Sequence, residues 1–259
     1  EADLWHIHNH SLGKNPILTE VVSKLSKEGY PLLLQIHDFA EDGRPKLYGR
    51  FSKETELYPR GEKTHYCLLN YRDYSILEKA GLKRERLHLL PNPIDFDLGH
   101  APKENLILYP SRAIRRKNLG EFLLWSLCAK DESLRFAVTL APKNPEEKPH
   151  YERWVAYVKD KALPVEFEYG KNFSNIGDIF ASAKCLGTTS ITEGFGLAFL
   201  EPWLANRPLI GRDLPEISQD FKDEGIDLSH LYQSLPVPLE IFDRRKLSEK
   251  IEESLKASY

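Results

Sequence analysis

The feature of this sequence that most constrains its fold is an alternation of short apolar runs with longer amphipathic stretches. The apolar runs, such as residues 31–36 and 106–109, are nearly continuous, which is typical of strands buried on both faces of a sheet. The stretches between the runs carry apolar residues at helical spacing. Strands that alternate with helices of about ten residues are typical of parallel sheets. The sequence therefore predicts a doubly wound α/β protein.

The alternation forms two blocks, which predicts two domains. In the first block we expect strands at 4–8, 31–36, 64–69 and 87–90, and helices at 17–28 and 72–80. In the second we expect strands at 106–109, 136–140, 165–169, 185–188 and 208–211, and helices at 119–129, 151–161, 176–183 and 195–205. A polar segment with Gly99 and Pro102 separates the blocks. We therefore place domains at 1–98 and 103–232. In the C-terminal segment, 233–259, we expect a charged amphipathic helix at 244–256, for which a return to the first domain stays open.

Composition narrows the classes of partner and location. Thirty-six Lys and Arg against 39 Asp and Glu give a net charge of −3, which is no basis for a general attraction to nucleic acid. No apolar run reaches the roughly 18 residues that a transmembrane helix needs. Cys67, Cys128 and Cys185 are odd in number and far apart, so we expect free thiols in a reducing compartment. We expect a cytoplasmic protein, with peripheral attachment to a membrane left open.

The segment 189–201 carries the most chemical information. We expect a strand to end near Ser190, a loop with Gly194 and Gly196 to follow, and a helix to begin around Phe195. The amides at a helix start attract anions, and glycines let the backbone approach a phosphate, so this loop is a candidate nucleotide cradle. Glu193 and Glu201 lie eight positions apart, about two helical turns, and are expected to face one cleft. The alternative is an N-capping Glu193 and a helix-surface Glu201.

A cluster of cations follows the strand expected at 106–109. Arg112 and Lys117 flank Arg115 and Arg116 in this segment. Such a cluster can neutralise a diphosphate and stabilise it as a leaving group. The alternative is a solvated basic loop. A nucleic-acid surface is less consistent with the sequence, because aromatic residues are not interleaved with these cations.

Histidines suggest a second class of function. His6, His8 and His10 alternate, so on a continuing strand their side chains would share one face. Neutral imidazoles on one face can hold zinc, which keeps a metal-dependent hydrolase as an alternative, with His37 and Asp38 as further ligands. His37 also ends an apolar strand, where side chains of open α/β sheets emerge into the ligand crevice. For each histidine alone, a structural role is the simpler interpretation.

Several of these segments together resemble one enzyme family. Glu193-Gly-Phe-Gly followed by Glu201 resembles the E-x7-E motif of the group 1, or family 4, retaining glycosyltransferases of GT-B fold. The segment from Ser111-Arg112 to Lys117-Asn118 resembles that family's phosphate-binding Arg and Lys. Asn92-Pro93-Ile94-Asp95 resembles its interdomain turn, and His37 its strand-end histidine in the acceptor domain. The resemblance extends over about residues 3–230, although Pro202-Trp203 departs from the residues usual after the second glutamate.

The resemblance implies two facing Rossmann-like domains, the N-terminal one truncated because its first strands have no counterpart here. It implies transfer of a glycosyl group from a nucleotide diphosphate sugar to an acceptor hydroxyl with retention of configuration, without metal or cofactor. The implied roles are phosphate binding by Arg112 and Lys117 and donor-sugar binding by Glu193 and His37. Glu201 would bind the ribose, and the backbone of Gly194, Phe195, Gly196 and Leu197 the donor.

The resemblance leaves the substrates and the activity open. The donor can be a UDP, GDP or ADP sugar, and the acceptor a glycan, a lipid or a small molecule. A fragment that binds nucleotide sugars without catalysis remains an alternative to the enzyme.

Overall fold

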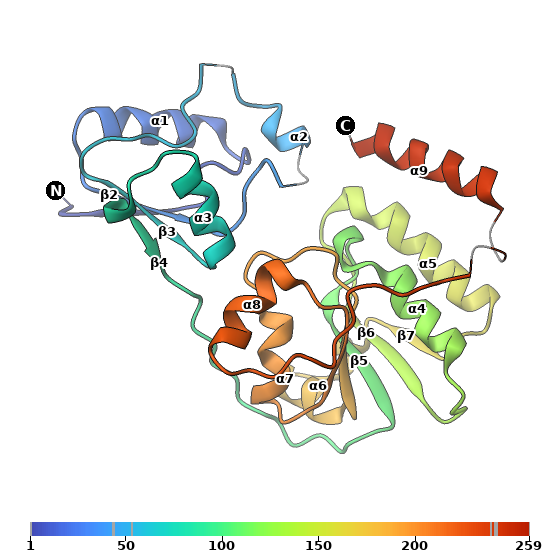
Figure 1. Ribbon diagram of the computed structural model, residues 1–259. Helices are drawn as coiled ribbons and strands as arrows, with labels where there is room; N and C mark the ends of the chain where they lie inside the picture. Colours follow the sequence, from blue (N-terminus) through green and yellow to red (C-terminus); the bar gives the residue numbers. More distant parts are fainter. Residues whose placement is uncertain (1, 43–44, 53, 239, 241–242, 259) are drawn as a thin grey trace. The chain divides into compact units, whose positions relative to one another are not determined.

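The computed structural model describes residues 2–42, 45–52, 54–238, 240 and 243–258. Contacts between residues divide the chain into two units, residues 1–92 together with 235–259, and residues 93–234 (Figure 1). Each of the two units contains a sheet of parallel strands joined by helices. The predicted α/β class is therefore confirmed. The placement of domains at 1–98 and 103–232 stays a prediction.

The described residues of the first unit form a parallel sheet in the order β1-β2-β3-β4. The strands are β1 (Trp5–His8), β2 (Leu32–Ile36), β3 (Thr64–Leu68) and β4 (Leu87–Leu89), and the helices are α1 (Pro16–Lys27), α2 (Pro45–Tyr48), α3 (Tyr71–Lys79) and the C-terminal α9 (Arg244–Ser258). The side chains of Asn15 and Asn70 cap the amides that open α1 and α3. The sequence predicts all of these elements except α2.

The two faces of this sheet differ in character. Leu34, Tyr66 and Leu87 lie side by side in the register and are buried against Val22 of α1 and Leu77 of α3. The next residues along the strands point to the other face, because side chains alternate. This second face carries His6 and His8 of β1, Gln35 of β2, His65 of β3 and His88 of β4, of which His6, His8 and His88 are exposed.

The second unit contains a parallel sheet in the order β7-β6-β5-β8-β9. Its strands are β5 (Leu106–Arg112), β6 (Arg135–Leu140), β7 (Val165–Phe167), β8 (Cys185–Thr188) and β9 (Leu209–Gly211), and its helices are α4 (Leu119–Cys128), α5 (Lys148–Asp160), α6 (Ile176–Ser182), α7 (Glu201–Leu204) and α8 (Pro215–Asp223). Tyr109 and Phe136 on one face pack against Phe122 of α4 and Trp154 of α5. Figure 1 shows α4 and α5 together beside this sheet.

The strand order of the second unit determines where a ligand can bind. The chain starts this sheet at β5, adds β6 and β7 on one side, and then adds β8 and β9 on the other. The direction of growth therefore reverses between β5 and β8. In open α/β sheets the crevice at the carboxyl ends of such neighbouring strands is where ligands bind. The segments that leave β5 and β8 there are residues 113–118 and 189–196, the two segments singled out by the sequence.

The predicted helix at 195–205 is wrong. Gly196 has a φ of +93°, outside the right-handed helical region, so no helix continues through it. A 3-10 turn, Leu197–Phe199, follows, and the α-helix begins only at Glu201 and has four residues. Pro202 near its start has no amide to bond back toward residue 198, which also breaks continuity with the turn. Glu193 and Glu201 thus do not share one helix.

Other boundaries differ less. β5 extends to Arg112 through a shift in its register with β6, so Arg112 ends a strand rather than lying in the following loop. α5 begins at Lys148, three residues before the predicted start. α8 was not expected, although Pro215 at its start and the buried Ile217 and Phe221, four positions apart, are a helical signal. None of the helices in the described ranges is long and apolar enough to span a membrane.

Candidate functional site

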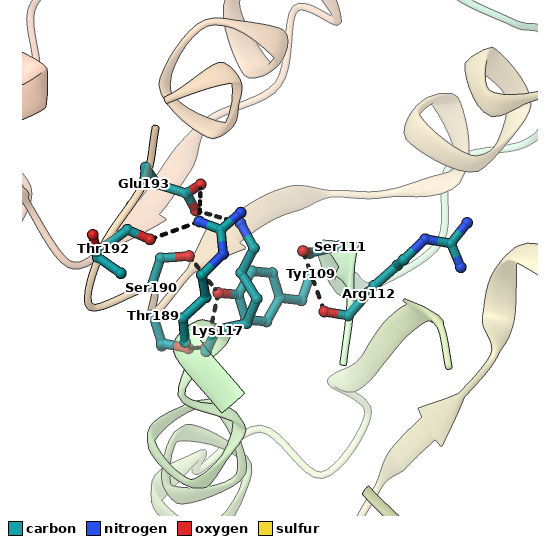
Figure 2. A network of polar contacts seen from close by, with 9 residues as sticks. Tyr109, Ser111, Arg112, Lys117, Thr189, Ser190, Thr192 and Glu193 are labelled. Atoms are coloured by element: carbon teal, nitrogen blue, oxygen red, sulfur yellow. Dashed lines mark hydrogen bonds and ion pairs between the residues drawn. The ribbon is translucent and has the colours of Figure 1, made fainter. Parts of the chain in front are cut away.

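Glu193 and Lys117 form the centre of the site. Glu193 follows β8, and its side chain is 8% exposed; Lys117 ends the 3-10 turn Arg115–Lys117 after β5, and its side chain is 11% exposed. The Lys117 ammonium donates to Glu193 Oε1 (Figure 2). A nearly buried carboxylate thus has a nearly buried cation beside it, at the switch between β5 and β8. The structure brings these two predicted site residues together.

Arg116 is a second cation on the same carboxylate. Its Nη1 donates to Glu193 Oε2 at 2.9 Å and to the backbone carbonyl of Thr192 at 2.9 Å. Arg116 is more accessible than Lys117, with 35% of its side chain exposed. The two oxygens of Glu193 are therefore held by two different residues that are adjacent in sequence.

Buried hydroxyl groups fasten the two segments to each other. The hydroxyl of Tyr109 on β5 donates to the Lys117 carbonyl at 2.8 Å and lies 3.0 Å from Ser190 Oγ. Thr189 Oγ1 donates to the same Lys117 carbonyl at 2.9 Å, and the Ile191 amide donates to the Arg116 carbonyl at 3.0 Å. The arrangement around Lys117 is visible in Figure 2. The backbone that presents Lys117 is thereby fixed relative to the backbone that presents Glu193.

The charges of the pair follow from these surroundings. Burial by itself would raise the pKa of Glu193, but the Lys117 and Arg116 cations lower that pKa below its ordinary value. Burial lowers the pKa of Lys117, and the carboxylate of Glu193 opposes that shift. Glu193 is therefore ionised at neutral pH, and its charge depends on the two cations that contact it.

Glu201 lies within electrostatic reach of the pair. Burial raises the pKa of Glu201, Lys117 lowers it, and the negative charge of Glu193 raises it further. Its side chain is only partly buried. Glu201 therefore interacts electrostatically with Lys117 and Glu193, although Glu193 and Glu201 do not share a helix.

Arg112 does not join this cluster. Its Nη1 donates to the Ala141 carbonyl after β6, at 3.3 Å. In Figure 2 its side chain points away from Lys117 and Glu193. Lys117 and Arg116 are thus the cations at Glu193, and Arg112 presents its charge on the β6 side of the β5 end.

The glycine-containing loop, residues 194–197, contains both buried and exposed side chains. Phe195 is buried edge-on against Phe221 of α8, with ring centroids 5.5 Å apart, so its side chain serves the core. Gly194 is partly buried and Leu197 is exposed. At Gly196 a Cβ would come 2.7 Å from Ile217 Cγ2. Because no long helix begins here, the expected attraction of an anion to a helix start at Phe195 does not apply; α7 has only four residues.

His37 lies in the other unit, directly after β2. Its amide donates to Asn9 Oδ1 at 2.8 Å, and its Nε2 shares a hydrogen bond with Nδ1 of His8 at 2.8 Å. Burial, together with the neighbouring His8, lowers the pKa of His37, and Asp38 opposes this. Its predicted approach to the donor site stays a prediction.

The expectation that His6, His8 and His10 share one face is wrong. The strand ends at His8, and Asn9 with a φ of +52° redirects the chain. His10 is consequently buried, where its Nε2 donates to the Leu57 carbonyl at 2.9 Å. Within the ranges that the structure describes, no three His, Cys, Asp or Glu side chains are grouped as a metal site. Cys67, Cys128 and Cys185 are unpaired, as expected.

The sequence reasoning did not assign individual roles to Arg116, Tyr109 and Ser190. The sequence groups Arg116 with the other cations, and its position beside Lys117 is the signal that both can reach one partner. Tyr109 ends the apolar run of β5 with a hydroxyl, and Ser190 lies in a run of hydroxyl residues, Thr188-Thr189-Ser190, at the end of β8. A hydroxyl at the carboxyl end of a buried strand was the available indication that the loops are joined there.

Comparison with known proteins places this geometry in context. No protein-family model matches the chain. The mannosylglucosyl-3-phosphoglycerate synthase of Petrotoga mobilis is 31% identical over an alignment that covers 98% of this chain and 55% of the relative. The chain therefore spans about half the length of the curated relative that it matches.

Solved structures show the same fold at low sequence identity. Anabaena Alr3699/HepE in complex with UDP has a TM-score of 0.62 at 15% identity, covering 99% of this chain and 71% of that chain. Its complex with UDP-glucose has a TM-score of 0.57 at 16% identity, covering 80% and 59%. Sucrose-phosphate synthase from Thermosynechococcus elongatus has a TM-score of 0.56 at 17% identity, covering 80% and 55%.

Proposed function

We propose that the chain, which has the fold of the GT-B glycosyltransferases, serves a retaining transfer of a glycosyl group from a nucleotide diphosphate sugar to an acceptor hydroxyl. The observation that carries the proposal is the contact of Lys117 with Glu193 at the switch between β5 and β8. This contact joins a cation that suits a phosphate to a carboxylate that suits sugar hydroxyls, at the edge where such sheets bind ligands.

The proposed chemistry is electrostatic. The bond between the anomeric carbon of the donor and the diphosphate oxygen breaks while the acceptor hydroxyl bonds to that carbon from the same face. Negative charge grows on the departing oxygen, and the proton of the acceptor hydroxyl passes to the diphosphate. Lys117 stabilises that charge, and Arg112 at the carboxyl end of β5 adds a second cation on the side of β6. A fixed charge in a water-poor site stabilises a transition state more than the same charge in water does. The enzyme would therefore act by position and charge, without a metal ion, because these cations supply what a bound metal supplies elsewhere.

Carboxylates give the proposed site its sugar contacts. Glu193 is ionised and accepts hydrogen bonds, so it suits the hydroxyls of a donor sugar. Glu201 lies nearby, and its role is ribose binding. By the family resemblance, His37 is a further candidate for a contact with the donor sugar. These roles give the donor an orientation before any bond breaks, which is a main source of rate in transfer reactions.

The comparisons suggest which substrates to try first. Anabaena Alr3699/HepE was solved with UDP and with UDP-glucose, so UDP-glucose is a first donor. The Petrotoga relative is named for mannosylglucosyl-3-phosphoglycerate, so phosphoglycerate glycosides are first acceptors and that compound is a first product to look for. We propose a small phosphorylated acceptor ahead of a glycan or lipid on this basis.

The test begins with binding. The full-length gene product is screened by thermal shift with UDP-, GDP- and ADP-sugars, and the sugar that stabilises it most is incubated with phosphoglycerate glycosides. We expect one nucleotide class to raise the melting temperature, and NMR of the product to show the anomeric configuration of the donor. A nucleotide that binds without transfer or hydrolysis would favour the non-catalytic alternative. An inverted anomer would contradict the retaining mechanism, and no binding of any nucleotide sugar would overturn the proposal.

A further inference from the structure

We propose that Arg116 is a positioning residue, which holds Glu193 in place when Lys117 turns from that carboxylate to the donor diphosphate. The inference rests on the proposed function, since it assigns a task to the site during donor binding. It starts from the unequal contacts of the two cations. Lys117 contacts the carboxylate of Glu193, whereas Arg116 Nη1 contacts that carboxylate and also the backbone of Thr192 just before it.

Lys117 cannot satisfy both anions equally. Its ammonium is a compact point charge on a flexible stem, and a diphosphate carries more charge than one carboxylate. Donor binding therefore draws Lys117 away from Glu193. A carboxylate whose side chain is only 8% exposed would then lose its nearest cation, and an unpaired buried charge is strongly unfavourable. Glu193 needs a second cation at that moment.

Arg116 has the properties for this task. A guanidinium stays charged at every physiological pH and donates several hydrogen bonds in fixed directions. Its contact with the Thr192 carbonyl at 2.9 Å does not involve the side chain of Lys117. The Arg116 carbonyl in turn accepts from the Ile191 amide at 3.0 Å, so its backbone is anchored to the same segment that it holds.

The neighbouring arginines do not duplicate this contact. Arg112 donates to the Ala141 carbonyl on the β6 side. Arg115 is exposed, and its amide donates to Glu147 Oε2 at 2.9 Å. The charged or titratable groups that act on Glu193 or are acted on by it are Lys117 and Arg116 of the 3-10 turn, Glu201 of α7 and Tyr109 of β5. Arg116 is the one of these that contacts both the side chain of Glu193 and the backbone before it.

The experiment compares four variants of the full-length gene product, Arg116→Gln, Arg116→Lys, Glu193→Gln and the double variant Arg116→Gln/Glu193→Gln. Arg153→Gln is the matched control, because it removes one arginine charge from the exposed surface of α5 in the same unit. Three quantities are measured for each protein: the pH profile of kcat/KM with the active nucleotide sugar, the Kd for UDP, and the melting temperature.

We expect Arg116→Gln to lower kcat/KM by about tenfold or more, as the loss of a charged contact commonly does. The Kd for UDP rises as well, because the diphosphate must then draw Lys117 from a carboxylate that Arg116 no longer contacts. The acidic limb of the profile moves to higher pH, because one of the two cations that lower the pKa of Glu193 is gone. Arg116→Lys restores part of these effects. In the Glu193→Gln background, Arg116→Gln has less than about a twofold further effect, because its partner is already neutral.

Several results would overturn the inference. One is an equal loss of kcat/KM on Arg116→Gln in the unsubstituted protein and in the Glu193→Gln variant, which would mean that Arg116 acts on another group. Another is an unmoved acidic limb, and a third is the same change in Arg153→Gln, which would reduce the effect to net charge. Absence of nucleotide binding and turnover in the unsubstituted protein would instead defeat the proposed function, and the inference with it. In that case the coupling of the melting temperatures still shows whether Arg116 and Glu193 form a structural ion pair.

Discussion

At the scale of single residues, the site depends on a carboxylate that is ionised although nearly buried. Charges of this kind persist in proteins only when opposite charges and hydrogen bonds compensate for lost solvation. Lys117 and Arg116 provide that compensation for Glu193. A ligand that binds Lys117 therefore changes the electrostatic surroundings of Glu193. Ligand binding and the charge of Glu193 are thus coupled.

The substitution Lys117→Ala tests the centre of the site. We expect turnover to fall at least about a hundredfold, because one electrostatic contact to the developing charge is lost. Lys171→Ala is the matched control, since Lys171 lies in the same unit and 68% of its side chain is exposed. Steady-state kinetics of the full-length gene product, with melting temperatures to verify folding, decide the matter. Unchanged kinetics in Lys117→Ala would remove Lys117 from the mechanism.

His10 makes a prediction about acid stability. Burial lowers the pKa of His10 to about 4 from its ordinary 6.5, and the bond to the Leu57 carbonyl opposes the shift only in part. Between these values the unfolded chain binds a proton that the folded chain does not, so stability is full above pH 6.5 and falls as the pH decreases toward 4. The loss amounts to about 3 kcal/mol at 1.36 kcal/mol per unit.

Denaturant unfolding between pH 7 and pH 4 measures this loss. His10→Gln should flatten the pH dependence across that window, because glutamine can keep a donor for the Leu57 carbonyl and does not titrate. The exposed His100 supplies the control His100→Gln, which should leave the slope as it was. An equally steep slope in His10→Gln would assign the acid sensitivity to other groups.

At the scale of elements, the turn at Gly196 determines where Glu201 lies. Its φ of +93° suits glycine, and a Cβ there would crowd Ile217 of α8. Gly225 offers a matched comparison, since its φ is +92° and nothing lies within 4 Å of the position of a Cβ. Both substitutions by alanine introduce backbone strain, and only Gly196→Ala also introduces a steric clash with Ile217.

We therefore expect Gly196→Ala to lower the free energy of unfolding by about 1–3 kcal/mol more than Gly225→Ala does. Chemical denaturation of the two variants measures the difference. Gly196→Ala should also weaken nucleotide binding, because it displaces the turn between Glu193 and Glu201. Equal destabilisation of the two variants would show that Ile217 and its neighbours yield without loss.

The elements themselves were largely predictable, and the reasons are local. Nearly continuous apolar runs identified β2 and β5, because strands covered on both faces have no polar side to present. The helix expected at 195–205 failed because apolar spacing says nothing about the φ of Gly196. The site shows the same limit. Glu193 and Lys117 could be paired by resemblance, but the contact of Arg116 with Glu193 and that of Tyr109 with Ser190 join segments that are distant in sequence.

At the scale of the whole molecule, each unit has a sheet and a buried core of its own. The core of the first unit gathers around Leu34 and Tyr66, and that of the second around Tyr109, Phe122 and Phe136. Leu34 of β2 and Leu108 of β5 are equivalent leucines, each fully buried in a central strand. A core that is complete within a unit can unfold as a cooperative element on its own.

Scanning calorimetry of the full-length gene product should accordingly resolve separate transitions for the two units. Leu34→Ala should lower the melting temperature of one transition, and Leu108→Ala that of another. Each variant should lower the free energy of unfolding of its unit by the roughly 2–5 kcal/mol typical of buried Leu→Ala changes. The two variants serve as controls for each other, since the same atoms are removed from each core. If either variant lowers every transition equally, the units unfold as one body and the division has no thermodynamic meaning.

The hydroxyl of Tyr109 has a further consequence for the thermodynamics of recognition. Because it bonds the carbonyl of Lys117 and lies beside Ser190, the segments that would grip a donor are already ordered before a donor arrives. A binding site that is ordered in this way loses little conformational entropy when a ligand binds. Titration calorimetry with a nucleotide should then show a modest entropic penalty. Tyr109→Phe, which keeps the ring and removes the oxygen, should make that penalty larger while the heat of contact stays similar.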